Sequence, residues 1–228
     1  MADDIACALI SGGLDSAVMV GLMLDQGTTV QPIYVRTGMA WESVEYQWLE
    51  RYLDAIASPR LRPVRSLAFP LDDVYGSHWS VGGEGSPDYD APDEAVYLPG
   101  RNIILVAKTS VFCALNGIHR IALGVLSGNP FPDATDSFFG LLAGSLSQGM
   151  AHPIAIERPL GGMKKEGVVR AGAHLPLGLT FSCISPKDGL HCGACNKCAE
   201  RQHGFDAAGL SDPTQYARPR EDAKKPML

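Results

Sequence analysis

No apolar run in this sequence of 228 residues approaches the ~20 residues that a membrane-spanning helix needs. Internal repeats are absent as well, and the first residues include Asp3 and Asp4 where a secretory signal would carry lysine or arginine. Neither a membrane span nor a repeat array is therefore expected. We expect a cytoplasmic protein, in which the six cysteines are reduced thiols rather than disulfides.

Charge is scarce and mainly negative. Charged residues make up 19% of the chain, and 25 acidic against 19 basic side chains give a formal net charge of −6. An acidic chain is poorly suited to sequence-independent binding of phosphate backbones, which favours a small-molecule substrate over a nucleic acid. The hydrophobic content of 46% is enough for the core of one large domain, alone or with a small appendage.

A short glycine-rich segment is the most informative feature of the chain. Residues 11–16 read Ser-Gly-Gly-Leu-Asp-Ser and lie between an apolar run at 5–10 and an amphipathic run at 17–24, an order typical of strand, turn and helix. Glycines let the backbone approach a ligand, and the unpaired N–H groups of a helix start attract anions. The segment lacks the Gly-Lys-Ser/Thr ending of a Walker A loop and the third glycine of the dinucleotide fingerprint. A plainer interpretation is a strand-to-helix turn capped by Asp15 or Ser16.

Hydrophobic periodicity predicts alternating strands and helices. The expected strands are 5–10, 30–35, 64–69, 120–126 and 154–156, and the expected helices are 17–24, 43–57, 103–116, 134–148 and 164–171. This alternation predicts an α/β fold with a parallel sheet and helices on both faces. Ligands of such sheets bind beyond the carboxyl ends of the strands, where the loops at 11–16 and 128–133 would meet. A long loop at 78–92 and a frayed tail at 210–228 complete the prediction.

Four of the six cysteines, Cys183, Cys192, Cys195 and Cys198, form the pattern C-x8-C-x2-C-x2-C. Four thiols so close together in a reduced chain predict a metal site, and a closed set of four thiolates favours a structural Zn²⁺ ion. An iron–sulfur cluster, a redox pair or plain buried thiols are the alternatives. Cys7 and Cys113 lie in apolar patterns and are expected in the core, whereas His191 is expected in an exposed loop.

The segment at 11–16 resembles the PP-loop of the ATP pyrophosphatases, in which this loop holds the β- and γ-phosphates while a substrate atom attacks the α-phosphate. Together with the four cysteines it resembles, more narrowly, the 7-cyano-7-deazaguanine synthase family, over residues 5 to 206. Further segments similar to that family are Leu98-Pro99-Gly100-Arg101-Asn102, Phe131-Pro132-Asp133 with Phe138, Met163-Lys164-Lys165, Thr180-Phe181-Ser182-Cys183 and Gly204-Phe205.

The resemblance implies an ATP-dependent ligase that forms carbon–nitrogen bonds. Its substrates would be 7-carboxy-7-deazaguanine and ammonia. An acyl adenylate would lead to 7-cyano-7-deazaguanine, a precursor of queuosine and archaeosine, with AMP or ADP and pyrophosphate or phosphate as by-products. The resemblance also implies Mg²⁺ bound with the ATP, and a homodimer.

The expected site residues follow from these motifs. The residues expected to bind ATP are Ser11, Gly12, Gly13, Leu14, Asp15, Ser16 and Asn102, and those expected to act on the reacting groups are Arg101, Asp133 and Lys165. Asp15 would cap the helix or help to place Mg²⁺. Arg101 would offer a fixed bidentate charge to phosphate or carboxylate, Lys165 would neutralise charge on the α-phosphate, and Asp133 would accept from the base or from ammonia. The plainer alternatives are a surface ion pair for Arg101, helix caps for Asn102 and Asp133, and a solvated helix start for Lys165.

Two segments depart from the family pattern, and both are expected to face a substrate. Residues 36–41 read Arg-Thr-Gly-Met-Ala-Trp where the family usually has Asp-Tyr-Gly-Gln-Arg-His, and residues 126–129 are a shortened form of its Asn-x-x-Asp-Tyr-Ser-Gly segment. The open alternatives are a paralogue that adenylates another carboxylate, including one on a protein, a PP-loop enzyme that modifies tRNA, and a non-catalytic nucleotide-binding protein. We expect a nucleotide-binding domain at 1–180, a zinc-binding segment at 181–206 and a tail at 207–228.

Overall fold

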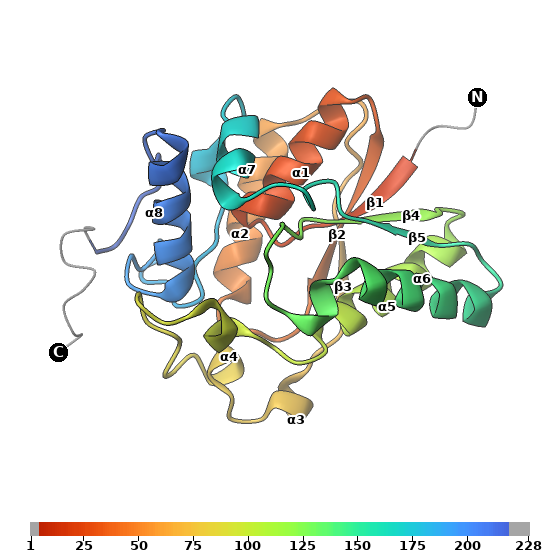
Figure 1. Ribbon diagram of the computed structural model, residues 1–228, viewed down its shortest axis with the longest axis horizontal. Helices are drawn as coiled ribbons and strands as arrows, with labels where there is room; N and C mark the ends of the chain where they lie inside the picture. Colours follow the sequence, from red (N-terminus) through yellow and green to blue (C-terminus); the bar gives the residue numbers. More distant parts are fainter. Residues whose placement is uncertain (1–4, 219–228) are drawn as a thin grey trace.

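The computed structural model describes residues 5–218. Its centre is a sheet of five strands, β1 (Ile5–Leu9), β2 (Thr29–Arg36), β3 (Arg65–Ala68), β4 (Arg120–Leu123) and β5 (Ala155–Glu157). The strands lie in the order β3-β2-β1-β4-β5, and every neighbouring pair is parallel. The predicted parallel α/β sheet is therefore confirmed, and each predicted strand is present (Figure 1).

Helices cover both faces of this sheet (Figure 1). The first face packs against α1 (Leu14–Asp25), α2 (Glu42–Ala55) and α7 (Lys165–Ala171), and the second face against α5 (Arg101–Leu115) and α6 (Asp136–Met150). Successive side chains of a strand point to opposite faces. In β1, Ala6 and Ala8 therefore enter the core of the first face, and Cys7 and Leu9 enter that of the second. Cys7 and Cys113 are fully buried, as the sequence predicts.

The connection between β3 and α5, in which the sequence predicts a long loop at 78–92, contains short helices. These are α3 (Asp72–Tyr75), α4 (Trp79–Gly82) and the 3-10 helix η1 (Asp93–Val96). Two further 3-10 helices lie elsewhere in the chain: η2 (Pro132–Ala134) after β4, and η3 (Leu177–Leu179) after α7. Trp79 of α4 stacks on Trp41, with 5.8 Å between the ring centroids. The connection is therefore packed against the residues that follow β2.

The sequence does not predict α8 (Asn196–Ala208), because its buried face is not apolar. Asn196, Arg201 and Gln202 are all buried there, beside Phe205, which joins the core of the first sheet face. No helix within residues 5–218 combines the length and the apolar character that a membrane span requires.

The residues after α8 differ from the predicted frayed tail. Tyr216 forms a parallel β-bridge with His191, and its hydroxyl donates to the Asp212 carboxylate at 2.6 Å. The prediction of fraying is therefore wrong for residues 210–218, while residues 219–228 lie outside the described part of the chain. The proposed domain division near residues 180 and 206 stays a prediction.

Candidate active site

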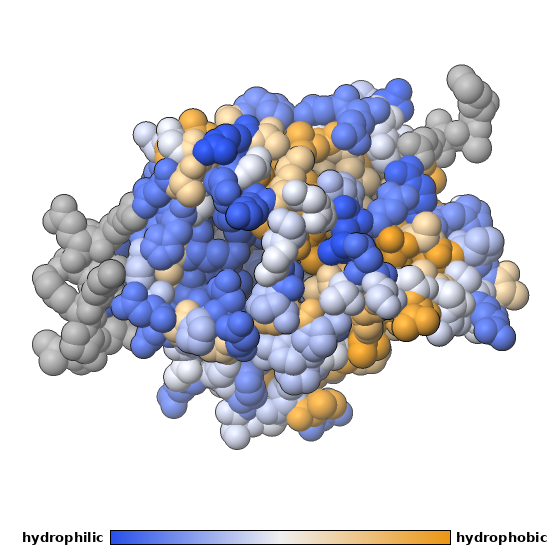
Figure 2. Space-filling view, viewed as in Figure 1, coloured by the Kyte–Doolittle hydropathy of each residue, from blue (hydrophilic) through white to orange (hydrophobic). Residues whose placement is uncertain are grey.

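A cavity of about 320 Å³ opens at the carboxyl edge of the sheet. Residues at the ends of three neighbouring strands line it: Ile10 after β1, Val35 in β2 and Leu123 in β4. The chain continues from β1 to β2 on one side and returns to β4 on the other, so this is the switch point where ligands of such sheets bind. Figure 2 shows the molecule hollowed between α8 and the β4–α6 connection, with hydrophilic residues around the hollow.

The Ser-Gly-Gly-Leu-Asp-Ser segment forms a tight turn that its own hydroxyls hold. Ser16 Oγ donates to the carbonyl of Gly13 (3.1 Å) and accepts from the N–H of Ser11 (3.2 Å). Ser11 Oγ in turn accepts from the N–H of Gly13 at 3.2 Å. Gly12 has a φ of 89°, in the left-handed region that favours glycine. The turn and the start of α1 line the cavity together.

Helix α1 begins at Leu14, three residues earlier than the sequence predicts, and Gly13 is its N-cap. The interpretation of Asp15 or Ser16 as a helix cap is therefore wrong, because both lie in the first turn. The Leu14 side chain is buried in the core, so only the backbone N–H of this residue is available to bind a phosphate. First-turn N–H groups have no partner within the helix, and with the helix dipole they form a positive site suited to phosphate.

Two close contacts fix the position of this turn. The N–H of Phe181 donates to the carbonyl of Gly12 at 2.7 Å. A Cβ on Gly124, directly after β4, would lie 2.8 Å from the backbone nitrogen of Ser16. Sequence reasoning missed Gly124, although a glycine at the end of a buried strand is a recognised signal of close backbone approach.

Lys165, the first residue of α7, reaches the turn from across the cavity. Its Nζ lies 2.8 and 2.7 Å from the two carboxylate oxygens of Asp15, and 2.7 Å from Oε1 of Glu200. Burial disfavours the charged form, but the two carboxylates outweigh it and raise the pKa of Lys165. Lys165 is therefore a fixed cation in the cavity wall and not a solvated helix start. Glu200 also contacts Lys197 Nζ at 2.6 Å.

Arg101 and Asn102 are the first two residues of α5, and both line the cavity. Arg101 Nε is buried, and within residues 5–218 the guanidinium has no hydrogen-bond or ion-pair partner. The surface ion pair considered from the sequence is therefore not formed. An unpartnered guanidinium beside the PP-loop is suited to a second anionic group, which it can bind with two parallel hydrogen bonds.

Asp133 holds the start of α5. Its Oδ2 accepts from the backbone N–H of Asn102 at 3.2 Å, and Asn102 Nδ2 donates to the Asp133 carbonyl at 3.0 Å. Neither residue is the N-cap predicted for it, because the N-cap of α5 is Gly100 and that of α6 is Thr135. Asp133 does not appear among the described residues that line the cavity. Its carboxylate therefore acts on the helix that presents Arg101, and a contact with the base or ammonia stays a prediction.

A buried acid that the sequence did not single out also lines the cavity. Glu45 of α2 is 8% exposed, and its Oε2 accepts from the hydroxyl of Tyr34 at 2.8 Å. Burial raises the pKa of Glu45 to about 7, against the opposing effects of the Arg101 charge and the Tyr34 hydrogen bond. In the sequence, the only signal of this burial is the position of Glu45 one turn into an amphipathic helix.

The two segments that depart from the family pattern differ in position. Thr37, Met39 and Trp41 line the cavity, so the segment 36–41 faces the candidate site, and its contact with a substrate stays a prediction. Residues 126–129 are not among the described residues that line it, although the flanking Val125 and Phe131 are.

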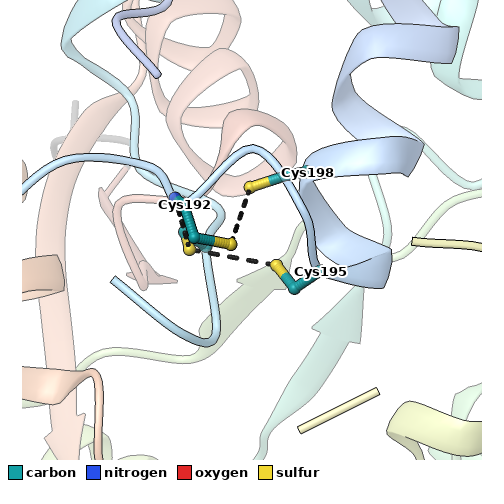
Figure 3. Close-up of side chains that lie close together, drawn as sticks. Cys192, Cys195 and Cys198 are labelled. Carbon is teal, nitrogen blue, oxygen red and sulfur yellow. Dashed lines mark hydrogen bonds between the residues drawn. The ribbon is translucent and has the colours of Figure 1, made fainter. Parts of the chain in front are cut away.

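The four cysteines Cys183, Cys192, Cys195 and Cys198 converge at the start of α8, and all are buried. Their Sγ atoms all lie within 4.8 Å of one another, with pairs at 3.9 and 3.8 Å. Four Zn–S bonds of ~2.3 Å at tetrahedral angles give very similar sulfur separations. Backbone N–H groups donate to the sulfurs at 3.3 Å and stabilise thiolate charge. Figure 3 shows the sulfurs of three of these cysteines directed toward one another.

The geometry is compatible with a single ion such as Zn²⁺. In an iron–sulfur cluster the ligating sulfurs belong to different iron atoms and stand farther apart. His191, beside the site, is 1% exposed rather than in an exposed loop, and its Nε2 accepts from the N–H of Ser182 at 3.1 Å. Burial, together with the charge of Arg201, lowers the pKa of His191 to about 3, which keeps the ring neutral.

The fold and the site together define an ATP-utilising protein of the PP-loop type with an added four-cysteine site. The family model described as queuosine biosynthesis protein QueC matches residues 5–209. This chain therefore belongs to the QueC family.

Relatives of known name agree with this assignment. The 7-cyano-7-deazaguanine synthase of Methanothrix thermoacetophila is 33% identical over 222 residues, which cover 92% of this chain and 98% of that protein. The 7-cyano-7-deazaguanine synthase of Azoarcus sp. is 30% identical over 223 residues, which cover 92% and 96%. The match thus extends over nearly the whole of both relatives.

Solved structures with a similar fold include two RNA-related proteins. The U34-tRNA thiolase NcsA from Methanococcus maripaludis, solved with its 4Fe-4S cluster, has a TM-score of 0.51 and 13% identity, and the match covers 82% of this chain and 61% of that one. A 4-thiouridine synthetase in complex with RNA and ATP has a TM-score of 0.50 and 15% identity, and the match covers 90% and 50%. At these identities the likeness shows the fold alone.

Proposed function

We propose that this protein uses ATP to join a carboxylate to ammonia, converting 7-carboxy-7-deazaguanine to 7-cyano-7-deazaguanine. The observation that carries the proposal is the convergence of the PP-loop, Arg101 and Lys165 on one cavity, in a chain of the QueC family. The net charge of −6 supports a small-molecule acceptor in preference to RNA.

The chemistry requires activation because a carboxylate oxygen is a poor leaving group. A carboxylate oxygen attacks the α-phosphate of ATP, which forms an acyl adenylate and expels pyrophosphate. Ammonia then displaces AMP and leaves an amide. The amide oxygen attacks a second ATP in the same way, and loss of AMP and of the nitrogen-bound protons yields the nitrile. The protein contributes position and charge stabilisation to each step.

The described side chains divide this work between them. The first-turn N–H groups of α1 hold the β- and γ-phosphates, and Lys165 neutralises charge that develops on the α-phosphate. Arg101 is free to bind the acceptor carboxylate or the α-phosphate through two hydrogen bonds. Asn102 borders the nucleotide, and Asp133 holds the helix that carries both residues.

Mg²⁺ would enter with the triphosphate, neutralise part of its charge and keep several of its own waters. Asp15 and Glu200 are oxygen donors in the cavity wall, and both are bound to Lys165. The residues present therefore suit water-mediated contacts to the ion better than direct ligation.

Zn²⁺ would be held by the four cysteines as a structural ion, because all four positions of a tetrahedral site are then filled by protein. Six free thiols suit a reducing compartment, and we propose a cytoplasmic location.

Incubation with ATP, ammonium and 7-carboxy-7-deazaguanine tests the function. Release of AMP and pyrophosphate that depends on the acid supports the proposal, and Lys165→Ala should abolish it. Release that requires another carboxylate, or tRNA, would contradict the assigned acceptor. ATP binding without release under any of these conditions would identify a nucleotide-binding protein instead.

We propose that two copies of the chain pair through the face formed by α5 and α6. Val111 and Leu115 on α5 and Leu141 on α6 are 51%, 82% and 73% exposed, and apolar residues gather over these helices in Figure 2. Burial of such side chains favours association. Sedimentation of the wild type and of Leu115→Glu tests the pairing: the wild type should be a dimer and the variant a monomer.

A further inference from the structure

The side chain of Lys165 crosses α8 on its way to the PP-loop. A Cβ on Gly204 would lie 2.5 Å from Lys165 Cγ, so the lysine stem passes over a point of α8 that only glycine leaves open. Glu200 is one turn earlier on the same face of the helix. Its Oε1 lies 2.7 Å from Lys165 Nζ. Helix α8 thus provides both a path for the stem and a carboxylate for the ammonium group.

We propose that Glu200 is a positioning residue for Lys165, and that Gly204 keeps open the path along which the lysine reaches the cavity. The inference rests on the proposed function, in which Lys165 acts on the α-phosphate. Glu200 acts through Lys165 and not on the reacting atoms.

The contacts of the ammonium group show why a second carboxylate matters. Lys165 has three N–H donors; Asp15 accepts at two oxygens, and Glu200 accepts at the third position. The two acids come from α1 and α8, so they fix the ammonium from different directions. Without the Glu200 carboxylate, the ammonium group would be held by Asp15 alone, and the Lys165 side chain would retain more of its rotamer freedom.

Lys197 makes this arrangement compatible with an anionic ligand. Its Nζ lies 2.6 Å from Oε2 of Glu200, and Lys197 itself lines the cavity. The two lysines balance the charges of Asp15 and Glu200, so these four groups together carry no net charge.

Glu200 is not required to dock α7 on α8. Arg170 of α7 donates to the carbonyls of Ala207 and Ala208, at 2.6 and 3.2 Å, and ties the two helices together at their far ends. The contact of Glu200 with Lys165 can therefore be removed while the helix pair stays joined.

The test variants are Glu200→Gln, Glu200→Asp and Gly204→Ala. The control is Glu166→Gln, which makes the same chemical change next to Lys165 at a position that does not line the cavity. The rate of acid-dependent AMP release is measured as kcat and as KM for ATP, and the melting temperature reports folding. We expect kcat to fall about tenfold in Glu200→Gln and in Gly204→Ala, equivalent to ~1.4 kcal/mol, with KM for ATP within twofold. Glu200→Asp should recover part of kcat, because it restores the charge.

Two results would overturn the inference. One is a kcat in Glu200→Gln within twofold of that in Glu166→Gln, while Lys165→Ala is inactive. The other is a change in KM alone, which would make Glu200 part of ATP binding. If the wild type releases no AMP with the acid, the proposed function fails instead. Crystal structures of the ligand-free wild type and Glu200→Gln then decide the positioning. The inference requires the Lys165 side chain of the variant to shift or to occupy more than one rotamer, and a lysine with the single wild-type position contradicts it.

Discussion

The N–H of Phe181 donates a 2.7 Å hydrogen bond to the carbonyl of Gly12, and this bond joins the PP-loop to the segment that enters the cysteine site. Phe181 and Cys183 belong to one buried apolar cluster. The position of the nucleotide-binding turn therefore depends on the part of the chain that contains the four cysteines.

Removal of the metal is expected to weaken ATP binding as well as to unfold the C-terminal segment, since binding of a structural ion contributes folding free energy. A zinc chelator should lower the melting temperature and reduce ATP affinity at least about tenfold, equivalent to ~1.4 kcal/mol. Elemental analysis should find one zinc per chain in the wild type and less in Cys198→Ser. Cys113→Ala, outside the site, should keep the metal. An ATP affinity that survives complete loss of metal would contradict the coupling.

Substitution of Gly12 is expected to damage the loop itself. In Gly12→Ala, the residue must keep a φ of 89° with its Cβ 3.1 Å from Leu49 Cβ, which should cost about 1–3 kcal/mol of stability. Calorimetry should also show a loss of ATP affinity, because the turn relaxes. Gly140→Ala is the matched control. It lies within α6 with no atom near the added Cβ, and should stabilise the protein by about 0.5–1 kcal/mol.

The strands and the PP-loop could be predicted because their signals are local. The apolar runs, the glycine pair and the cysteine spacing each lie within a short stretch of sequence. The contact of Lys165 with Asp15 joins residues 150 positions apart, and no local pattern encodes it. The burial of Arg201 and Gln202 depends on α8, whose polar composition hides its buried face. The sequence places Asp133 at the start of a helix near residue 134, whereas its carboxylate accepts from the first turn of α5, 31 residues earlier in the chain.

Glu45 is expected to make stability depend on pH. Its pKa is about 7 in the folded protein, above the value of 4.5 that applies to an unfolded chain. The folded state therefore binds the proton more tightly. The contribution is fully present below pH 4.5 and is lost as the pH rises through 7, by about 3 kcal/mol in total.

The measurement is the free energy of unfolding of wild type and Glu45→Gln between pH 5 and 8. The variant should be increasingly stable relative to wild type as the pH rises, because a neutral amide replaces a carboxylate that must ionise in a buried place. Glu50→Gln, exposed on the same helix, is the control. A difference between wild type and Glu45→Gln that does not change with pH would contradict the assignment.

Arg201 is expected to be among the most costly side chains to remove. It is 1% exposed, and its guanidinium donates to the Leu177 carbonyl at 2.8 Å and to the Thr180 hydroxyl at 2.7 Å. Arg201→Met removes these hydrogen bonds and leaves Asp212 without its ion-pair partner at 3.8 Å, and should destabilise the fold by roughly 3–5 kcal/mol. Arg201→Lys keeps the charge but not the fork of donors, and should recover only part of this loss. Arg60→Met, at an exposed position, is the control in denaturant unfolding; equal losses in the two methionine variants would refute the role assigned to Arg201.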